Sequence, residues 1–273
     1  MSINLSGQVN TTMTQTTQPQ TIAHESATKE EKYLEYILTH AERNNPDSII
    51  EETHNFAIKR HWLMNIGPEK SPIVEEVLQE KRPKARHLPI SSKIIMEIGC
   101  YLGYSAIRFA SYVKNTLGIQ DVKYYSLEIS ETHANIAAQI IKGSSDESIK
   151  EFPSTFNLFG KLDFVVIDHS KTVYKRDLQL LEKSGAFHTV SRLENFYQPF
   201  EKWTLTDLRP HGKKKNSQGT TIIADNVILP GAPDYLEYVR SEPTKYQTRF
   251  VESWLEYYEG VERDGMEISV WLK

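Results

Sequence analysis

KIIMEIGCYLGYSAIRFASYV, residues 93–113, carries the clearest evidence for the fold class. Its first part is an apolar run of strand length that ends at Gly99, and from Tyr104 onward the apolar residues recur at helical spacing. A strand that turns through glycines into a helix opens a βα unit, and such units build parallel sheets covered by helices. Gly99 and Gly103 in the turn would also let a ligand approach the backbone closely.

The rest of the chain alternates in the same way. Apolar strands are expected at 122–129, 162–169 and 220–227, and helices at 29–41, 47–61, 71–81, 131–142, 172–184 and 233–241. Thr28 and Glu31 match a capping box at the start of the first helix. Segments 249–257 and 265–273 alternate like an antiparallel strand pair. The pattern predicts an α/β fold, a mostly parallel sheet with helices on both faces and an antiparallel pair at the C-terminus.

Composition excludes several classes of protein. The chain has 273 residues, a net charge of −4 and one cysteine. The acidic balance argues against a nucleic-acid partner, and a single cysteine rules out an intrachain disulfide or a multi-cysteine metal site. No run approaches the ~20 apolar residues of a membrane span. We therefore expect a cytoplasmic protein with no membrane partner, a monomer whose residues 1–28 form a disordered polar tail without a targeting signal and whose residues 29–273 form one domain.

The glycine loop has the chemistry of a cofactor site. Glu97 stands two residues before Gly99, and the spacing to Gly103 is G-x-x-x-G rather than the G-x-G-x-x-G of dinucleotide sites. A carboxylate there would repel a pyrophosphate but suits an ammonium group. Glu128 ends the next strand, where an acidic side chain can bind two ribose hydroxyls. Together they indicate S-adenosylmethionine, whereas the glycines alone could be only a tight turn.

Oxygen ligands follow two further strands. Asp168 ends one strand, and Asp225 and Asn226 end the next. Two carboxylates and an amide oxygen suit Mg²⁺ if the strands are neighbours, although a lone strand-end aspartate more often caps a helix. A lysine on a strand-end loop, such as Lys171, is usually solvated. Beside a divalent cation and a cationic cofactor, however, its amine would lose a proton more readily and could act as a base.

Two other residues near these strand ends stay open. His169 could pack in the core or stack near the base of the cofactor. Cys100 lies beside the glycine loop but has no evident partner in the sequence, so we do not expect a catalytic thiol.

Six pieces of the chain form a recognisable set: WLMNIG (62–67), EIGCYLGYSAIR (97–108), EI (128–129), DHSK (168–171), ADNVILPGAPD (224–234) and WLEY (254–257). Through them the chain resembles the catechol O-methyltransferase family of class I S-adenosylmethionine-dependent enzymes, over about 29–185 and 219–273. The ADNVILPGAPD block is much more specific than the glycine loop. The resemblance implies a Rossmann-like methyltransferase fold and Mg²⁺-dependent methylation of a small catechol.

The resemblance also implies a role for individual positions. The cofactor would be bound by Met64, Ile66, Glu97, Gly99, Tyr101, Ser105, Glu128, Ile129, Ser145, Asp168 and His169. The metal ligands would be Asp168, Asp225 and Asn226, with Lys171 as the general base. The catechol would contact Trp62, Lys171, Asn226, Pro230 and Glu256.

The chain departs from the family at several places. Ser170 and Asp146 stand where the family usually has Trp and Gln. Only fifteen positions separate Glu128 from Gly143, so we expect a loop and an edge strand to be missing there. Conversely, about 186–218 is predicted to be an insertion. It could be a native surface loop, and both features could instead be errors in the gene model.

The residues also leave three competing functions open. One is a metal-dependent O-methyltransferase of another vicinal diol or a caffeoyl ester. The second is a protein that binds S-adenosylmethionine but is catalytically impaired by the missing strand. The third, a nicotinamide-dependent oxidoreductase, lacks the G-x-G-x-x-G spacing.

Overall fold

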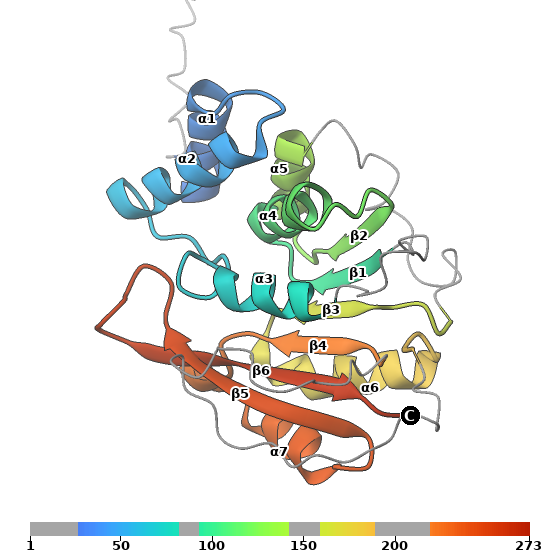
Figure 1. Cartoon of the computed structure of the whole chain (residues 1–273). Coiled ribbons are helices and arrows are strands. Elements are labelled where there is room, and N and C mark those ends of the chain that lie inside the picture. Colours follow the sequence, from blue (N-terminus) through green and yellow to red (C-terminus); the bar gives the residue numbers. More distant parts are fainter. Residues whose placement is uncertain (1–26, 82–92, 142–158, 189–218) are drawn as a thin grey trace, which may run out of the picture.

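The structure is a computed structural model that describes residues 27–81, 93–141, 159–188 and 219–273 (Figure 1). The tail expected over 1–28 lies almost wholly outside these ranges, as do Ser145 and 189–218 of the expected insertion. None of the helices in the described ranges has the length and apolarity needed to span a membrane.

A six-stranded sheet with the order β2-β1-β3-β4-β6-β5 forms the centre of the molecule (Figure 1). The strands are β1 (Lys93–Ile98), β2 (Val122–Leu127), β3 (Phe164–Ile167), β4 (Thr221–Ala224), β5 (Tyr246–Trp254) and β6 (Arg263–Trp271). The first four are parallel, whereas β6 runs antiparallel to β4 and to β5. The predicted mostly parallel sheet with a C-terminal antiparallel pair is confirmed.

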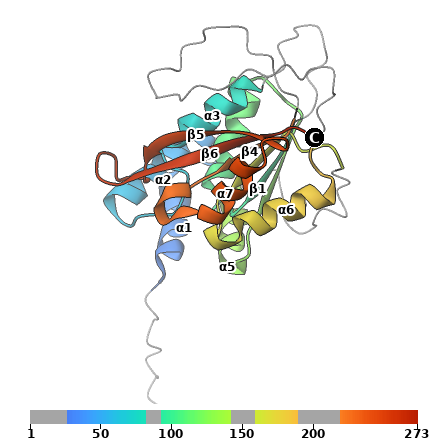
Figure 2. The same ribbon diagram turned by 90° about the horizontal axis from the view of Figure 1, so that it is seen from below.

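Helices cover both faces of the sheet (Figure 2). They are α1 (Lys29–His40), α2 (Pro46–Lys59), α3 (Ser71–Glu80), α4 (Tyr104–Ser111), α5 (Glu131–Ile141), α6 (Tyr174–Ser184) and α7 (Pro233–Ser241). Side chains of a strand alternate between faces, so neighbours such as Ile95 and Met96 belong to different cores. Ile95 packs with α3 and α4, and Met96 packs with α6 and α7.

A third cluster lies at the carboxyl end of the sheet. There α1, α2 and α5 pack around the turn between β1 and α4, with Tyr33, Phe56 and Leu102 among the buried residues. The Thr28–Glu31 capping box is present at the start of α1, as the sequence predicts. These helices therefore form a wall beside the glycine loop.

Several element boundaries differ from the sequence prediction. The strand expected at 162–169 spans only Phe164–Ile167, so the predicted range is two residues too long at each end. The helix expected at 172–184 begins with a 3₁₀ turn, Lys171–Val173. Ala186 and Phe187, counted in the expected insertion, instead pack in the core with β4 and α6.

Candidate active site

The residues singled out in the sequence meet at one edge of the sheet. The carboxyl ends of β1 to β4 point to the same side, and the turn between β5 and β6 comes back to it (Figure 1). In open α/β sheets this edge is where ligands bind.

The glycine loop brings two strand ends into close contact. Gly99 has φ +102°, and a Cβ there would lie 2.1 Å from the carbonyl oxygen of Asp168. Gly103, the N-cap residue directly before α4, is also left-handed, with φ +87°. Glycine at 99 is therefore needed both for its backbone conformation and for the close approach of the chain after β3.

Glu97 is a fully buried carboxylate at the end of β1. It accepts hydrogen bonds from Ser105 and, at 2.5 Å, from Ser126. Burial raises the pKa of Glu97 to about 7, against the lowering effect of the two serines. A buried carboxylate with so raised a pKa would be stabilised by a cation, as an amino-acid ammonium would supply.

Glu128 is held in place by the backbone. Its Oε2 accepts from the amide of Tyr101 at 2.8 Å, and its Oε1 accepts from the amide of Ser130 at 2.8 Å. The neighbouring Ile129 is fully exposed, and Met64 is half-exposed. Exposed apolar side chains beside a fixed carboxylate suit a nucleoside, which has an apolar base and a ribose with two hydroxyls.

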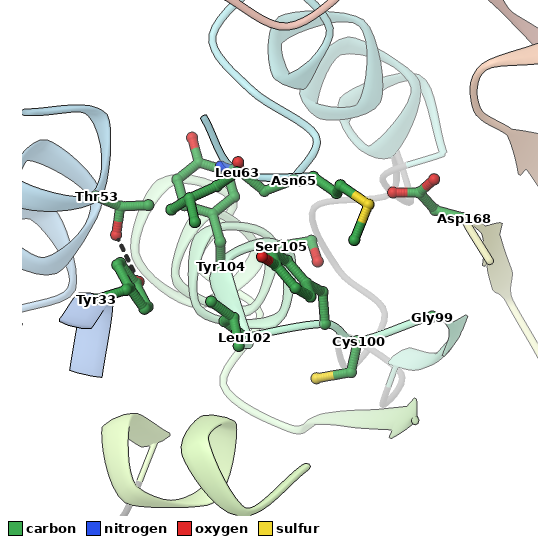
Figure 3. Close-up of a pocket in the computed structure, with 12 residues that line it drawn as sticks. Tyr33, Thr53, Leu63, Asn65, Gly99, Cys100, Leu102, Tyr104, Ser105 and Asp168 are labelled. Carbon is green, nitrogen blue, oxygen red and sulfur yellow. Dashed lines mark hydrogen bonds between the residues drawn. The ribbon is translucent and has the colours of Figure 1, made fainter. Parts of the chain in front are cut away.

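A pocket lies between this loop and the α1–α2 pair (Figure 3). Its lining is Tyr33, Thr53, Leu63, Met64, Asn65, Gly99, Cys100, Tyr101, Leu102, Tyr104, Ser105 and Asp168. Figure 3 shows Asp168 on the opposite side from Tyr33 and Thr53. Five predicted cofactor residues in addition to Asp168 line the pocket or its loop: Met64, Glu97, Gly99, Tyr101 and Ser105. Ile66 lies instead in the core beside α3, so its predicted role stays a prediction.

The pocket also contains the single cysteine of the chain. Burial raises the pKa of the Cys100 thiol to about 12. A thiol with this pKa carries almost no thiolate near neutral pH, so it is a poor nucleophile.

Asp168, Asp225 and Asn226 end the adjacent strands β3 and β4. Asp225 Oδ1 accepts from the amide of Asn226 at 2.7 Å, while its Oδ2 is buried with no hydrogen-bond partner among the described residues. Burial raises the pKa of Asp225. An orphaned carboxylate oxygen is costly unless it has a ligand, so this donor set fits an oxygen-preferring cation.

The acidic side chains alone do not make a metal cluster. Within the described ranges, no group of three His, Cys, Asp or Glu side chains could hold a metal ion. The predicted ligands Asp168, Asp225 and Asn226 are not such a group, because the third ligand is an amide oxygen.

Lys171 lies directly beside these groups. Its Nζ donates to Asp168 Oδ1 at 2.8 Å and to the Tyr174 hydroxyl at 2.7 Å. The Tyr174 hydroxyl in turn donates to the backbone oxygen of Asp225 at 3.1 Å. The amine is thus fixed between the ends of β3 and β4.

His169 forms a pair with a carboxylate on α6. Its Nε2 lies 2.7 Å from Asp177 Oδ2, and its Nδ1 is buried with no partner within the described chain. Burial lowers the pKa of His169, so the ring is neutral at physiological pH.

The substrate residues come from three segments. Trp62 donates from its indole nitrogen to the backbone oxygen of Glu256 at 3.0 Å. Pro230 follows Ile228 and Leu229, two exposed apolar residues after β4. Trp62 and Glu256, 194 positions apart, are thereby brought to one edge of the site.

The sequence motifs do not identify two buried residues of the site, Lys70 and Asp264. Lys70 has no exposed surface, and its Nζ lies 2.8 Å from Asp225, 2.7 Å from Glu256 and 2.5 Å from Asp264. Burial raises the pKa of Glu256 to about 8, and the charge of Asp225 adds to this while Lys70 opposes it. Lysine and aspartate are mostly exposed residues, so no local pattern at 70 or 264 indicates this burial.

The chain is similar to known methyltransferases, although no protein-family model matches it. It is 28% identical to catechol O-methyltransferase of Bos taurus, over 90% of this chain and 77% of that protein. Among solved structures it is similar to precorrin-6y C5,15-methyltransferase from Geobacter metallireducens, with 12% identity, 77% and 92% of the two chains covered, and a TM-score of 0.43.

A second relative decides the family. The chain is 30% identical over 258 residues to catechol O-methyltransferase B of Danio rerio, and the alignment covers 90% of this chain and 80% of that protein. The recognition based on the sequence motifs is confirmed: the chain belongs to the catechol O-methyltransferase family.

Proposed function

We propose that this protein transfers a methyl group from S-adenosylmethionine to a hydroxyl oxygen of a catechol, with Mg²⁺ as its metal. Family membership supports S-adenosylmethionine-dependent O-methylation. The observation that carries the metal and the acceptor is that Asp168, Asp225 and Asn226 follow the adjacent strands β3 and β4, with the amine of Lys171 fixed on Asp168 beside the glycine-loop pocket.

When bound, S-adenosylmethionine supplies an electrophilic methyl group, and Mg²⁺ supplies a Lewis acid that lowers the pKa of a catechol hydroxyl. Asp168, Asp225 and Asn226 would hold the metal. Glu97 would bind the ammonium group of the cofactor, and Glu128 would accept from its ribose hydroxyls.

The residues around the acceptor have separate tasks. Lys171 takes the proton of the reacting hydroxyl at its Nζ, which requires the amine to be neutral when the catechol binds. Glu256 accepts a hydrogen bond from the second hydroxyl. Trp62 and Pro230 contact the flat ring and restrict its orientation. Holding the acceptor oxygen in line with the methyl group should supply much of the rate enhancement.

A methyl-transfer assay tests the proposal. The purified protein is incubated with labelled S-adenosylmethionine and catechol, with Mg²⁺ or with a chelator, and next to a caffeoyl ester and an aliphatic vicinal diol. We expect transfer to catechol that requires Mg²⁺ and fails in Asp225→Ala. Preference for the caffeoyl ester or the aliphatic diol would show that catechol is not the acceptor. Equal transfer with Mg²⁺ and with the chelator would show that the reaction needs no metal. Binding of S-adenosylmethionine without transfer to any acceptor would support the impaired alternative.

A further inference from the structure

We infer that Asp264, on β6, is a positioning residue that turns the amide oxygen of Asn226 toward the metal site. This inference rests on the proposed function, because it assigns Asn226 as a metal ligand. Asp264 is not among the site residues that the motifs predict, and its side chain has no exposed surface.

Four donors converge on the carboxylate of Asp264. Its Oδ2 accepts from Lys70 Nζ at 2.5 Å and from Asn226 Nδ2 at 2.7 Å. Its Oδ1 accepts from the backbone amides of Ile228 at 3.2 Å and Leu229 at 3.0 Å. Both oxygens are therefore surrounded by groups that can only donate, and a carboxylate is the side chain that satisfies all of them.

The contact fixes which way the Asn226 amide faces. An asparagine side chain has a donor end and an acceptor end of nearly the same shape. Since Asp264 can only accept, it binds the nitrogen of Asn226 and leaves the amide oxygen on the other side. Asn226 follows Asp225 directly at the end of β4 and has a left-handed backbone, φ +52°. We infer that its free amide oxygen faces the metal site that Asp225 would share.

Asparagine at position 264 would reverse this arrangement. It has one accepting oxygen and one donating nitrogen, and so cannot satisfy two pairs of donors. The backbone amides of Ile228 and Leu229 cannot turn, so they keep the oxygen. The new nitrogen then faces both Lys70 and Asn226. The Lys70 ammonium loses this acceptor and keeps Asp225 and Glu256. The amide of Asn226 can flip to accept from the new nitrogen, and its own nitrogen would then face the metal site.

Binding of Mn²⁺ to the protein alone, followed by electron paramagnetic resonance, tests this directly. Mn²⁺ shares the oxygen ligands of Mg²⁺. We expect Asp264→Asn to bind Mn²⁺ about 10–100-fold more weakly, the usual effect of removing a group that orients a ligand. The double variant Asp264→Asn, Asn226→Asp should recover most of this affinity. In it, the amide nitrogen introduced at position 264 can donate to one oxygen of the carboxylate introduced at position 226, which leaves the other oxygen for the metal.

Glu267→Gln is the matched control. Glu267 is buried on the same strand but is paired with Arg240. Its loss should lower the stability of the protein and leave Mn²⁺ affinity unchanged. Because its partner Arg240 is half-exposed, this control separates loss of a buried carboxylate charge on β6 from loss of orientation.

The outcomes distinguish this inference from the proposed function. Wild-type affinity in Asp264→Asn, or a double variant as weak as the single one, would overturn the role of Asp264. If Asp264→Asn does not fold, the double variant decides: binding within a few-fold of the wild type supports the inference, and its absence overturns it. Wild-type protein that binds no Mn²⁺, or binding that survives Asp225→Ala, would instead overturn the metal site of the proposed function.

Discussion

Lys171 is the residue on which the proposed chemistry depends most. Its amine is fixed by Asp168 and Tyr174, and it lies between the two strand ends that would hold the metal. We expect Lys171→Ala to lower kcat by about 10²–10⁴-fold, the usual contribution of a positioned acid–base group. Affinity for S-adenosylmethionine should change little, because the amine acts in the chemical step. Steady-state kinetics and calorimetry measure the two effects.

Lys175→Ala is the control for this variant, since Lys175 lies one turn away against Tyr238. Its kcat should equal that of the wild type. Raising the pH should partly rescue Lys171→Ala, because solvent can then ionise the catechol. Near-normal kcat of Lys171→Ala at neutral pH would mean that metal activation alone is sufficient.

Glu128 allows a separate test of cofactor binding. Its carboxylate accepts from two backbone amides and lies beside the exposed Ile129. Removing an acceptor that hydrogen-bonds to ribose costs about 1.5–3 kcal/mol, so Glu128→Ala should weaken S-adenosylmethionine binding about 10–100-fold. Calorimetry measures this affinity, and Glu131→Ala, at an exposed residue, is the control. Equal affinity in the two variants would remove Glu128 from the site.

The turn from β1 into α4 is the element that joins fold to site. Gly99→Ala should strongly destabilise the protein, because its Cβ would overlap the backbone of Asp168 as well as strain a left-handed conformation. Gly118→Ala is matched to it, since Gly118 has φ +71° but nothing within 4 Å of a Cβ. It should cost only about 1–2 kcal/mol. Urea unfolding compares the two; equal losses would show that the close approach at Gly99 is unimportant.

The edge of the sheet leads to a prediction about the gene. Within the described residues, β2 pairs only with β1 and leaves its outer edge unpaired. Unpaired edges invite aggregation, and natural proteins usually protect them. We expect the transcript to encode more residues between Ile141 and Gly143, and fewer within 186–218, than this sequence contains. Full-length cDNA that agrees with the sequence at every position would refute this.

Local chemistry determines which elements the sequence predicts well. The range of α7 matches its prediction because Pro233 begins the helix at its first turn, and Thr28 likewise begins α1. Strand ends are predicted less well. The run at 162–169 continues past the last residue of β3 into Asp168, whose amide still donates to Ile98 while its side chain belongs to the site. Periodicity reports burial, and it cannot show where a functional loop interrupts pairing.

In the molecule as a whole, some contacts of the site cannot be predicted from the sequence. Glycines and strand-end acids predict the pocket because their chemistry is local. Lys70 and Asp264 are 194 positions apart and meet only after the β5–β6 pair folds back against the loop before α3. A lysine in GPEKS and an aspartate at the start of a strand carry no local sign that they will be buried together.

The buried acids also predict how the stability of the whole molecule depends on pH. Glu97 has a pKa of about 7 in the folded protein, raised by burial from its ordinary value of 4.5. Between these two pH values the folded state binds a proton that the unfolded state has lost. The stabilisation is therefore fully present below about pH 4.5 and is lost as pH rises through about 7.

A cationic ligand should reverse this trend. The ammonium group of S-adenosylmethionine favours ionised Glu97, so its affinity should increase as pH rises from about 5 to about 7.5, with a proton released on binding below about pH 7. Thermal unfolding across this range, with and without S-adenosylmethionine, measures both effects. In Glu97→Gln both pH dependences should be reduced, because the amide does not titrate. If the stability of Glu97→Gln falls with pH as steeply as that of the wild type, another buried acid is responsible, and Glu256, with its pKa of about 8, is the next to replace.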